Sequence, residues 1–257
     1  PSILAGLPKD SVFRDFSNLE ELEEDIQAIK KALNANNGGN QWLVIRNLTE
    51  TAIDALASEE SPFPDVEYCF EWDGSVGLVK IFHCVLHDYV VENTAKVIDH
   101  QLRDMGVPTN DCKFHRNRAT VYETTSYGKN ADWIFTPASR RFDDEGSCWP
   151  TLVIEAGVGE SRGKLIENAK WWFANSAGTV RIVLLILMGR KDVRFEKWQL
   201  TTDVPDNQGE RPDDLQIVSL DPYRIAYPAQ KVRVTEDGVF GAPMTLHFEA
   251  LYDRPAR

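Results

Sequence analysis

The sequence predicts an α/β protein, in which one large domain holds a mixed sheet flanked by helices. Two observations indicate this fold. Residues 152–154 form an apolar run and 180–188 form another apart from Arg181, which is typical of parallel strands buried on both faces. A helical pattern between these runs makes 150–188 a predicted strand–helix–strand unit. The length of 257 residues is sufficient to bury a substantial core.

The N-terminal part, residues 1–77, is expected to form mainly helical additions. Apolar residues at helical spacing predict an amphipathic helix over 18–33, and Asn36 to Gly39 would end it. A strand is expected at 42–45, a short helix at 51–57 and another strand at 66–72. A single long helix is then expected from Leu78 to Met105, ended by Gly106.

The segment 78–190 is predicted to form the core, in the order α-β-β-β-α-β. Its first two strands, 119–127 and 131–136, are expected to pair as a hairpin because turn residues separate them. A third strand leads to Glu155, a helix follows, and 180–188 is the last strand. Residues 191–257 contain shorter segments separated by proline, aspartate and glycine, which indicates a β-rich extension.

The charge distribution bears on the partners of the protein. A formal net charge of −12 argues against coating of nucleic acid by bulk electrostatics. Between residues 113 and 141, however, six basic residues face two acidic ones, a local charge of +4. The basic residues are Lys113, Arg116, Arg118, Lys129, Arg140 and Arg141. This segment is either a solvated face or a patch that meets the phosphate backbone of a nucleic acid.

The cysteines and the hydropathy indicate an intracellular protein. Its four cysteines lie far apart, which fits reduced thiols in the cytoplasm or nucleus better than a disulfide framework or a zinc site. The apolar run at 180–188 is too short to cross a membrane as a helix, and charged residues interrupt the N-terminal apolar residues. We therefore expect no contact with a membrane.

Two acidic residues on neighbouring predicted strands form the candidate site. Asp132 begins one strand and Glu155 ends the apolar part of the next, with Lys129 close by in the turn. Two such carboxylates can share Mg²⁺ or Mn²⁺, and the cation would activate water for attack on a phosphodiester. The alternative is that Glu155 is a paired structural residue.

The helix after Glu155 supplies further candidates. Stepping about 100° per residue places Leu165, Ile166 and Ala169 on the side that faces the core. Lys170 falls at the rim of this face, whereas Lys164 and Trp171 point well away from it. Trp171 is therefore expected to be exposed or covered by another segment. A homodimer that forms through Trp171 or the C-terminal strands is a further hypothesis.

The order of elements, with Asp132 followed by Val153-Ile154-Glu155-Ala156-Gly157, resembles the PD-(D/E)XK nuclease superfamily, which has a restriction-endonuclease-like fold. The run from Val153 to Ser161, followed by Lys170 to Phe173, is similar to a poorly characterised, mainly fungal group of that superfamily. The resemblance covers roughly residues 80–190. It implies the αβββαβ core and a metal-dependent nuclease.

The resemblance also implies roles for individual residues. Asp132 and Glu155 would bind the metal, although Ala131 replaces the proline that usually precedes this aspartate. The catalytic lysine two positions after the glutamate is replaced by Gly157. Lys170 is the best substitute, with Lys164 and Lys129 behind it. Glu160 and Ser161 would add a ligand or a hydrogen bond, and helix capping is the alternative role of Ser161.

The predicted function is hydrolysis of DNA or RNA with Mg²⁺ or Mn²⁺. A catalytically inactive nuclease fold that serves as a binding or interaction module is the alternative, which the glycine at position 157 and the acidic composition favour. An enzyme of other chemistry in the same cleft is a third possibility. The sequence has no P-loop, HExxH or GxSxG motif, and Arg162 stands where a dinucleotide fingerprint requires glycine.

Overall fold

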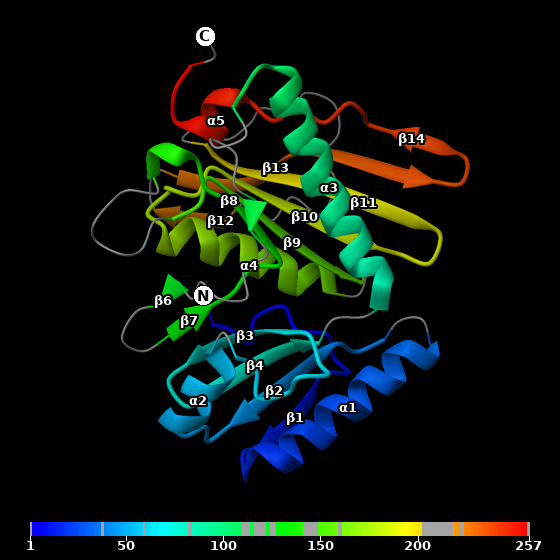
Figure 1. Cartoon of the computed structure of the whole chain (residues 1–257), viewed down its shortest axis with the longest axis vertical. Coiled ribbons are helices and arrows are strands. Elements are labelled where there is room, and N and C mark those ends of the chain that lie inside the picture. The colour runs from blue at the N-terminus through cyan, green and yellow to red at the C-terminus, as the bar shows by residue number, and fades with distance from the viewer. Residues whose placement is uncertain are drawn as a thin grey trace.

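The protein is an α/β structure in which two mixed sheets lie one above the other (Figure 1). The computed structural model describes residues 2–36, 39–58, 60–81, 84–108, 114–115, 122–123, 127–140, 149–158, 161–201, 218–221 and 224–255. The α/β class predicted from the sequence is confirmed. None of the described helices is both long and apolar enough to cross a membrane.

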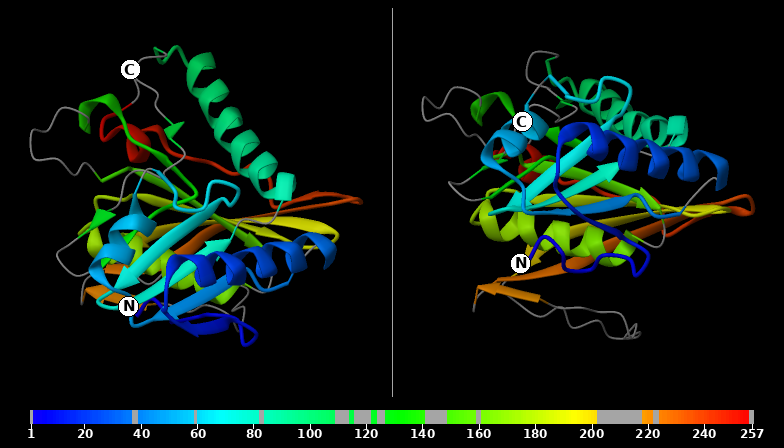
Figure 2. Two further views of the ribbon diagram at one scale, coloured as in Figure 1. Left: turned by 60° about the horizontal axis from the view of Figure 1, so that its bottom comes forward. Right: turned by 90° about the horizontal axis from the view of Figure 1, so that it is seen from below.

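The N-terminal sheet, called sheet A, has the strand order β1-β2-β4-β3-β7-β6. Its strands are β1 (Val12–Asp15), β2 (Trp42–Arg46), β3 (Tyr68–Asp73), β4 (Val76–Ile81), β6 (Tyr122–Glu123) and β7 (Tyr127–Lys129). Helices α1 (Leu19–Asn36) and α2 (Glu50–Ala57) pack on one face of it. Figure 2 shows α1 lying along these strands. The opposite face carries Trp42, Val44 and Leu78.

The second sheet, sheet B, has the order β12-β13-β11-β10-β9-β8-β5, and β14 pairs with β13. Its strands are β5 (Phe114–His115), β8 (Trp133–Phe135), β9 (Leu152–Val158), β10 (Ile182–Met188), β11 (Asp192–Thr201), β12 (Val218–Asp221), β13 (Arg224–Thr235) and β14 (Gly238–Phe240). Strands β9 and β10 are parallel, and β8 pairs antiparallel with β9. A short 3-10 helix, Ala138–Arg140, follows β8.

The two faces of sheet B are covered by different helices. Helices α3 (Cys84–Asp104) and α5 (Phe248–Tyr252) pack on the face that carries Leu152, Ile154 and Ile186. Helix α4 (Arg162–Asn175) packs on the face that carries Val153 and Leu185. Figure 1 shows α4 on the side of sheet B that faces sheet A. Since Glu155 lies two residues after Val153 along β9, its side chain is on the same face and also points toward α4 and sheet A.

Most of the predicted elements are present close to their expected bounds. These are α1, β2, α2, β3, β9, α4 and β10. The C-terminal part is rich in strands, as expected, and ends in the short helix α5. In the N-terminal part, α1 and α2 accompany the strands β1 to β4, which form most of sheet A.

Two predictions about the middle of the chain are wrong. The long helix expected from Leu78 begins only at Cys84, because β4 (Val76–Ile81) pairs with β2 and β3. The expected boundary between residues 77 and 78 therefore falls inside a strand. The expected hairpin does not form either: β7 pairs with β3 in sheet A, whereas β8 pairs with β9 in sheet B. The chain passes from one sheet to the other between Lys129 and Trp133.

Candidate functional site

Asp132 and Glu155 occupy neighbouring positions on sheet B. The pairing of β8 with β9 sets Trp133 opposite Ile154 and Ile134 opposite Val153. Continuing this register by one residue places Asp132 opposite Glu155, so both carboxylates lie on the same face. Both residues are buried, at 4% and 2% exposure. The sequence prediction that these two acids lie close together is therefore supported by the register.

The carboxylate of Asp132 is held by several donors. Its Oδ2 atom lies 2.5 Å from Nζ of Lys80 and accepts a hydrogen bond of 2.6 Å from the amide N–H of Ala156. Nε2 of His87 lies 3.5 Å from the same oxygen, and the thiol of Cys69 donates to Oδ1 at 3.6 Å. Burial alone would raise the pKa of Asp132, but the charges of Lys80 and His87 hold it well below its usual value.

The pKa values of the groups around Asp132 are shifted as well. Burial lowers the pKa of Lys80, but the carboxylates of Asp132 and Glu155 more than offset this, so that it ends above its usual value. Burial also lowers the pKa of His87, but the carboxylate of Asp132 more than offsets this and leaves the pKa of His87 above its usual value. Burial, with Asp132 next, raises the pKa of the Cys69 thiol well above its usual range. Cys69 is therefore a neutral, unreactive thiol at neutral pH.

Glu155 is held mainly by helix α4. Its Oε1 atom accepts a hydrogen bond of 2.7 Å from the indole of Trp172, and its Oε2 atom accepts one of 3.2 Å from the amide of Asn168. Nζ of Lys129 lies 3.9 Å from Oε1. Both carboxylate oxygens of Glu155 thus have donors within the protein.

A third buried acid, Glu71 on β3, completes the cluster. Its carboxylate lies 2.9 Å from Nζ of Lys129 and 2.7 Å from Nζ of Lys164. Burial alone would raise the pKa of Glu71, but these two ammonium groups hold it below its usual value. Burial, together with the charge of Lys129, lowers the pKa of Lys164 to about 8 despite the nearby Glu71. The pKa of Lys129 is lowered by burial but raised overall by Glu71 and Glu155.

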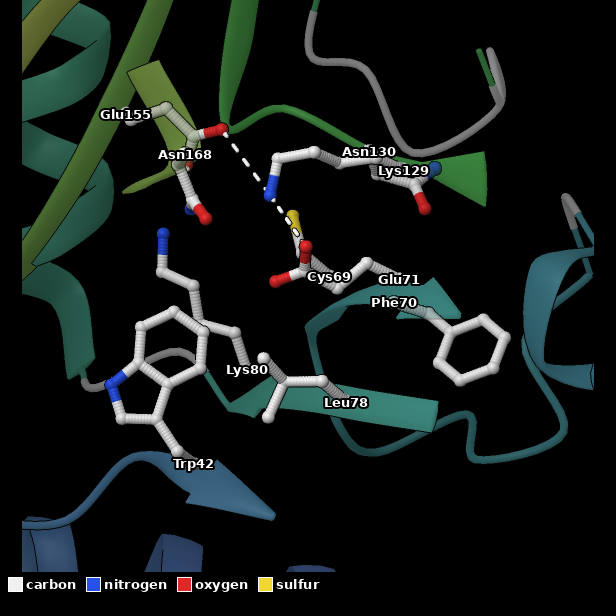
Figure 3. Close-up of a pocket in the computed structure, with 10 residues that line it drawn as sticks. All are labelled: Trp42, Cys69, Phe70, Glu71, Leu78, Lys80, Lys129, Asn130, Glu155 and Asn168. Atoms are coloured by element: carbon white, nitrogen blue, oxygen red, sulfur yellow. Dashed lines mark hydrogen bonds and ion pairs between the residues drawn. The ribbon is translucent and has the colours of Figure 1, made fainter. Parts of the chain in front are cut away.

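These side chains join the two sheets through a single charge cluster (Figure 3). In Figure 3 the side chain of Lys80 rises from β4 toward Glu155 and Asn168, and Lys129 lies between Glu155 and Glu71. Three carboxylates (Glu71, Asp132, Glu155) face three lysines (Lys80, Lys129, Lys164), so their formal charges cancel. The ring of Trp42 lies about 6 Å from both Lys80 and Lys164. The cavity between them has a volume of about 10 Å³, room for roughly one water molecule.

The arrangement does not fit a bound divalent cation. All four carboxylate oxygens of Asp132 and Glu155 are contacted by protein donors, and two of the nearby groups are ammonium ions. Positive charges at this distance repel a second cation. Within the described part of the chain, no group of three or more histidine, cysteine, aspartate or glutamate side chains is arranged to hold a metal. The two predicted ligands, Asp132 and Glu155, lie together, but protein donors already contact the carboxylate oxygens that would coordinate a metal.

The lysines proposed as catalytic lie at different places. Lys129 and Lys164 belong to the cluster, where each contacts Glu71. Lys170, the preferred candidate, is buried and pairs with Glu167 on its own helix at 2.5 Å. The helical wheel placed Lys164 away from the core of sheet B, and this is correct: its side chain extends toward sheet A, into the cluster between the two sheets (Figure 1).

Other predicted residues have structural partners. The hydroxyl of Ser161 does not cap α4; it accepts a hydrogen bond from the indole of Trp42. Arg140 binds Asp253 and donates to the carbonyl oxygens of Trp149 and Thr179. Trp171 is buried against Trp149 and Trp172 and offers no exposed surface for a homodimer, whereas Phe240 of β14 is exposed.

Several predicted residues lie outside the described part of the chain. They are Lys113, Arg116, Arg118, Arg141 and Glu160. Conversely, the sequence reasoning missed Glu71, Lys80, His87, Asn168 and Trp172. A signal for two of them was present, because Glu71 and Lys80 are single charges inside apolar strands, the same pattern that drew attention to Glu155.

Gly157, where the nuclease pattern requires lysine, faces helix α4. A Cβ atom at this position would lie 3.2 Å from Cβ of Ser161, 3.4 Å from a methyl of Leu165 and 3.5 Å from the amide nitrogen of Gln41. The glycine therefore allows α4 and β2 to pack closely against the end of β9.

No protein-family model matches this chain, and no curated protein is significantly similar to it. The interpretation of the site therefore depends on its own geometry.

Proposed function

We propose that this chain uses a nuclease-like scaffold to bind nucleic acid without hydrolysing it. The order α3, β5, β8, β9, α4, β10 along the chain supports the αβββαβ core, with β6 and β7 inserted into sheet A. Strands β5, β8, β9 and β10 are neighbours in that order. The restriction-endonuclease-like fold and its superfamily are part of this proposal.

The state of Asp132 is the observation on which the absence of catalysis depends. The oxygen that would bind a metal is paired with Lys80 and bonded to the amide of Ala156. Glu155 lines a cavity of only about 10 Å³, far too small for a phosphodiester and its attacking water. Within the described residues, the acidic pair is thus a neutralised, buried pair.

The nucleic-acid contact is proposed for the basic segment 113–141. Lys129 and Arg140 of this segment bind Glu71 and Asp253, so they are committed to the fold. Lys113, Arg116, Arg118 and Arg141 are the basic residues that we propose to meet the phosphate backbone. Such contacts would make the affinity fall steeply with salt concentration.

The test is one experiment with two readouts. Fluorescently labelled single- and double-stranded DNA and RNA are mixed with the protein in Mg²⁺ or Mn²⁺, and anisotropy and strand cleavage are followed together. We expect salt-dependent binding, weakened by the Arg116→Ala/Arg118→Ala variant, and no cleavage above background. The Lys9→Ala variant, with a basic residue outside this segment, is the matched control. The proposal fails if nothing binds.

A metal-dependent nuclease is the second candidate. The placement of Asp132 opposite Glu155 on one face favours it, since adjacent carboxylates are what a Mg²⁺ or Mn²⁺ site requires. The same assay separates the two candidates: metal-dependent cleavage that the Glu155→Ala variant loses would establish the nuclease and overturn the non-catalytic proposal.

A further inference from the structure

We infer that the ammonium group of Lys80 stands in the position from which a divalent cation would bridge Asp132 and Glu155. The inference goes beyond the proposed function, because it concerns how the buried acids are compensated rather than what the surface binds. It predicts that removal of this ammonium group creates a metal site at Asp132 and Glu155.

The position of Lys80 supports the inference. Its Nζ atom lies 2.5 Å from Oδ2 of Asp132, and its side chain points toward Glu155, which lines the same cavity (Figure 3). Lys80 reaches the acids from β4 of sheet A, whereas Asp132 and Glu155 belong to sheet B. A single positive group between two carboxylates of adjacent strands does electrostatically what a bound cation would do.

Asn168 supplies a second, independent observation. Its amide nitrogen donates to Glu155, but its Oδ1 atom is buried and has no hydrogen-bond partner among the described residues. Asn168 is 2% exposed and lines the cavity, with its side chain directed between Glu155 and Lys80 (Figure 3). A buried oxygen without a donor is suited to a cation or to a water molecule that a cation holds.

The charge balance indicates what removal of Lys80 would do. With Lys80 present, three lysines compensate three carboxylates; in the Lys80→Ala variant one buried carboxylate loses its lysine, and within the described residues His87, 3.5 Å from Asp132, is the remaining positive partner of that acid. The truncation also removes the long side chain and opens space beside Asp132. A hard divalent cation would replace the lost positive charge, and the water molecules it keeps would fill the opened space, since such a cation takes carboxylate, amide and water oxygens.

Thermal unfolding of the purified chain with Mn²⁺ or with EDTA tests this inference. For wild type we expect the same Tm in both buffers. For Lys80→Ala we expect a lower Tm in EDTA and a rise of about 5 °C or more with saturating Mn²⁺. Adding Asp132→Asn to Lys80→Ala should abolish the rise. Lys96→Ala, which removes an exposed lysine, is the control for non-specific metal effects.

Two outcomes would overturn the inference. One is a folded Lys80→Ala protein whose Tm does not respond to Mn²⁺. The other is calorimetric binding of Mn²⁺ to wild type that Asp132→Asn abolishes, because the position would then be open while Lys80 is present. The wild-type titration decides the matter even if Lys80→Ala fails to fold in either buffer. No nucleic acid is used, so this result is independent of the binding and cleavage assay.

Discussion

Nζ of Lys164 on α4 lies 2.7 Å from the carboxylate of Glu71 on β3, so this pair joins the helix of one sheet to a strand of the other. A helix between two sheets has two buried faces. One face of α4 packs on sheet B, and Lys164 extends from another face toward sheet A. The cluster is therefore part of the junction between the two sheets as well as the candidate site.

Replacement of Glu71 by glutamine should destabilise the protein strongly. Lys129 and Lys164 share this carboxylate, and both are buried, so the variant leaves two ammonium groups with less compensation. Breaking a buried ion pair on one side costs about 3–5 kcal/mol. Urea denaturation of Glu71→Gln should show a loss of stability in that range.

The control for this variant is Glu20→Gln, because Glu20 is exposed on helix α1. Such a surface change should alter the free energy of unfolding by no more than about 0.5 kcal/mol. Equal, small effects of the two substitutions would show that the cluster contributes little to the junction.

The depressed pKa of Lys164 predicts a pH dependence of stability above pH 8. The folded-state pKa is about 8, whereas the ordinary value is 10.5. Between these values the unfolded chain binds more protons than the folded protein, so the contribution of Lys164 to stability rises with pH. The free energy of unfolding of wild type minus that of Lys164→Met should therefore increase from pH 8 to pH 10.

Denaturation of both proteins at pH 7, 8, 9 and 10 measures this difference. Subtracting the free energy of unfolding of the variant reduces the contribution of the other titrating groups. Among these are Lys80 and Lys129, whose pKa values are raised, so that they lose their protons at higher pH. A difference that stays flat or falls over this range would mean that Lys164 is not depressed.

The local elements of the fold were predictable, whereas the assignment of strands to sheets was not. The parallel pair β9 and β10 and helix α4 follow from apolar runs and helical spacing. Strand β4 was missed because Leu78, Val79 and Ile81 continue into the apolar pattern of α3 without a break. Strands β7 and β8 are close in sequence, but their partners, β3 and β9, are far away, and local patterns contain no information on such pairing.

The site was predictable only in part, for a similar reason. Asp132 and Glu155 could be paired because adjacent strands of one sheet hold them. Lys80 and Glu71 come from sheet A, so their place beside these acids depends on how two sheets pack. The sequence could not show that lysines from another sheet would pair with these acids.

Trp172 and Trp133 provide a matched pair of substitutions. The indole of Trp172 donates to Glu155 at 2.7 Å, whereas Nε1 of Trp133 is buried and has no partner among the described residues. Trp172→Phe should cost about 1–3 kcal/mol from the lost charged hydrogen bond, with some further loss of packing. Trp133→Phe removes an unsatisfied donor and should cost clearly less. Chemical denaturation compares them, and similar losses would contradict a role of the Trp172 hydrogen bond.

Restoring the lysine of the nuclease pattern at position 157 should not restore a nuclease. A side chain at Gly157 would point at Ser161, Leu165 and Gln41, with the first contact already at 3.2 Å for Cβ alone. Gly157→Lys should therefore force α4 away from β9 and cost about 1–3 kcal/mol, the usual penalty of overpacking. Gly157→Ala should cost less, since only its Cβ must be accommodated.

Cleavage and stability of the Gly157→Lys variant are measured together. With Mg²⁺ or Mn²⁺ we expect no cleavage by either Gly157 variant, because Lys80 still pairs with Asp132 and the cavity beside Glu155 remains too small for a phosphodiester. Cleavage by Gly157→Lys without loss of stability would mean that the acids are free to bind a metal and that the glycine alone silences the site. Cleavage is then compared among three variants: Gly157→Lys, Lys80→Ala and the double variant Lys80→Ala/Gly157→Lys. Cleavage by the double variant alone would mean that both the loss of Lys80 and a lysine at position 157 are needed for Asp132 and Glu155 to act.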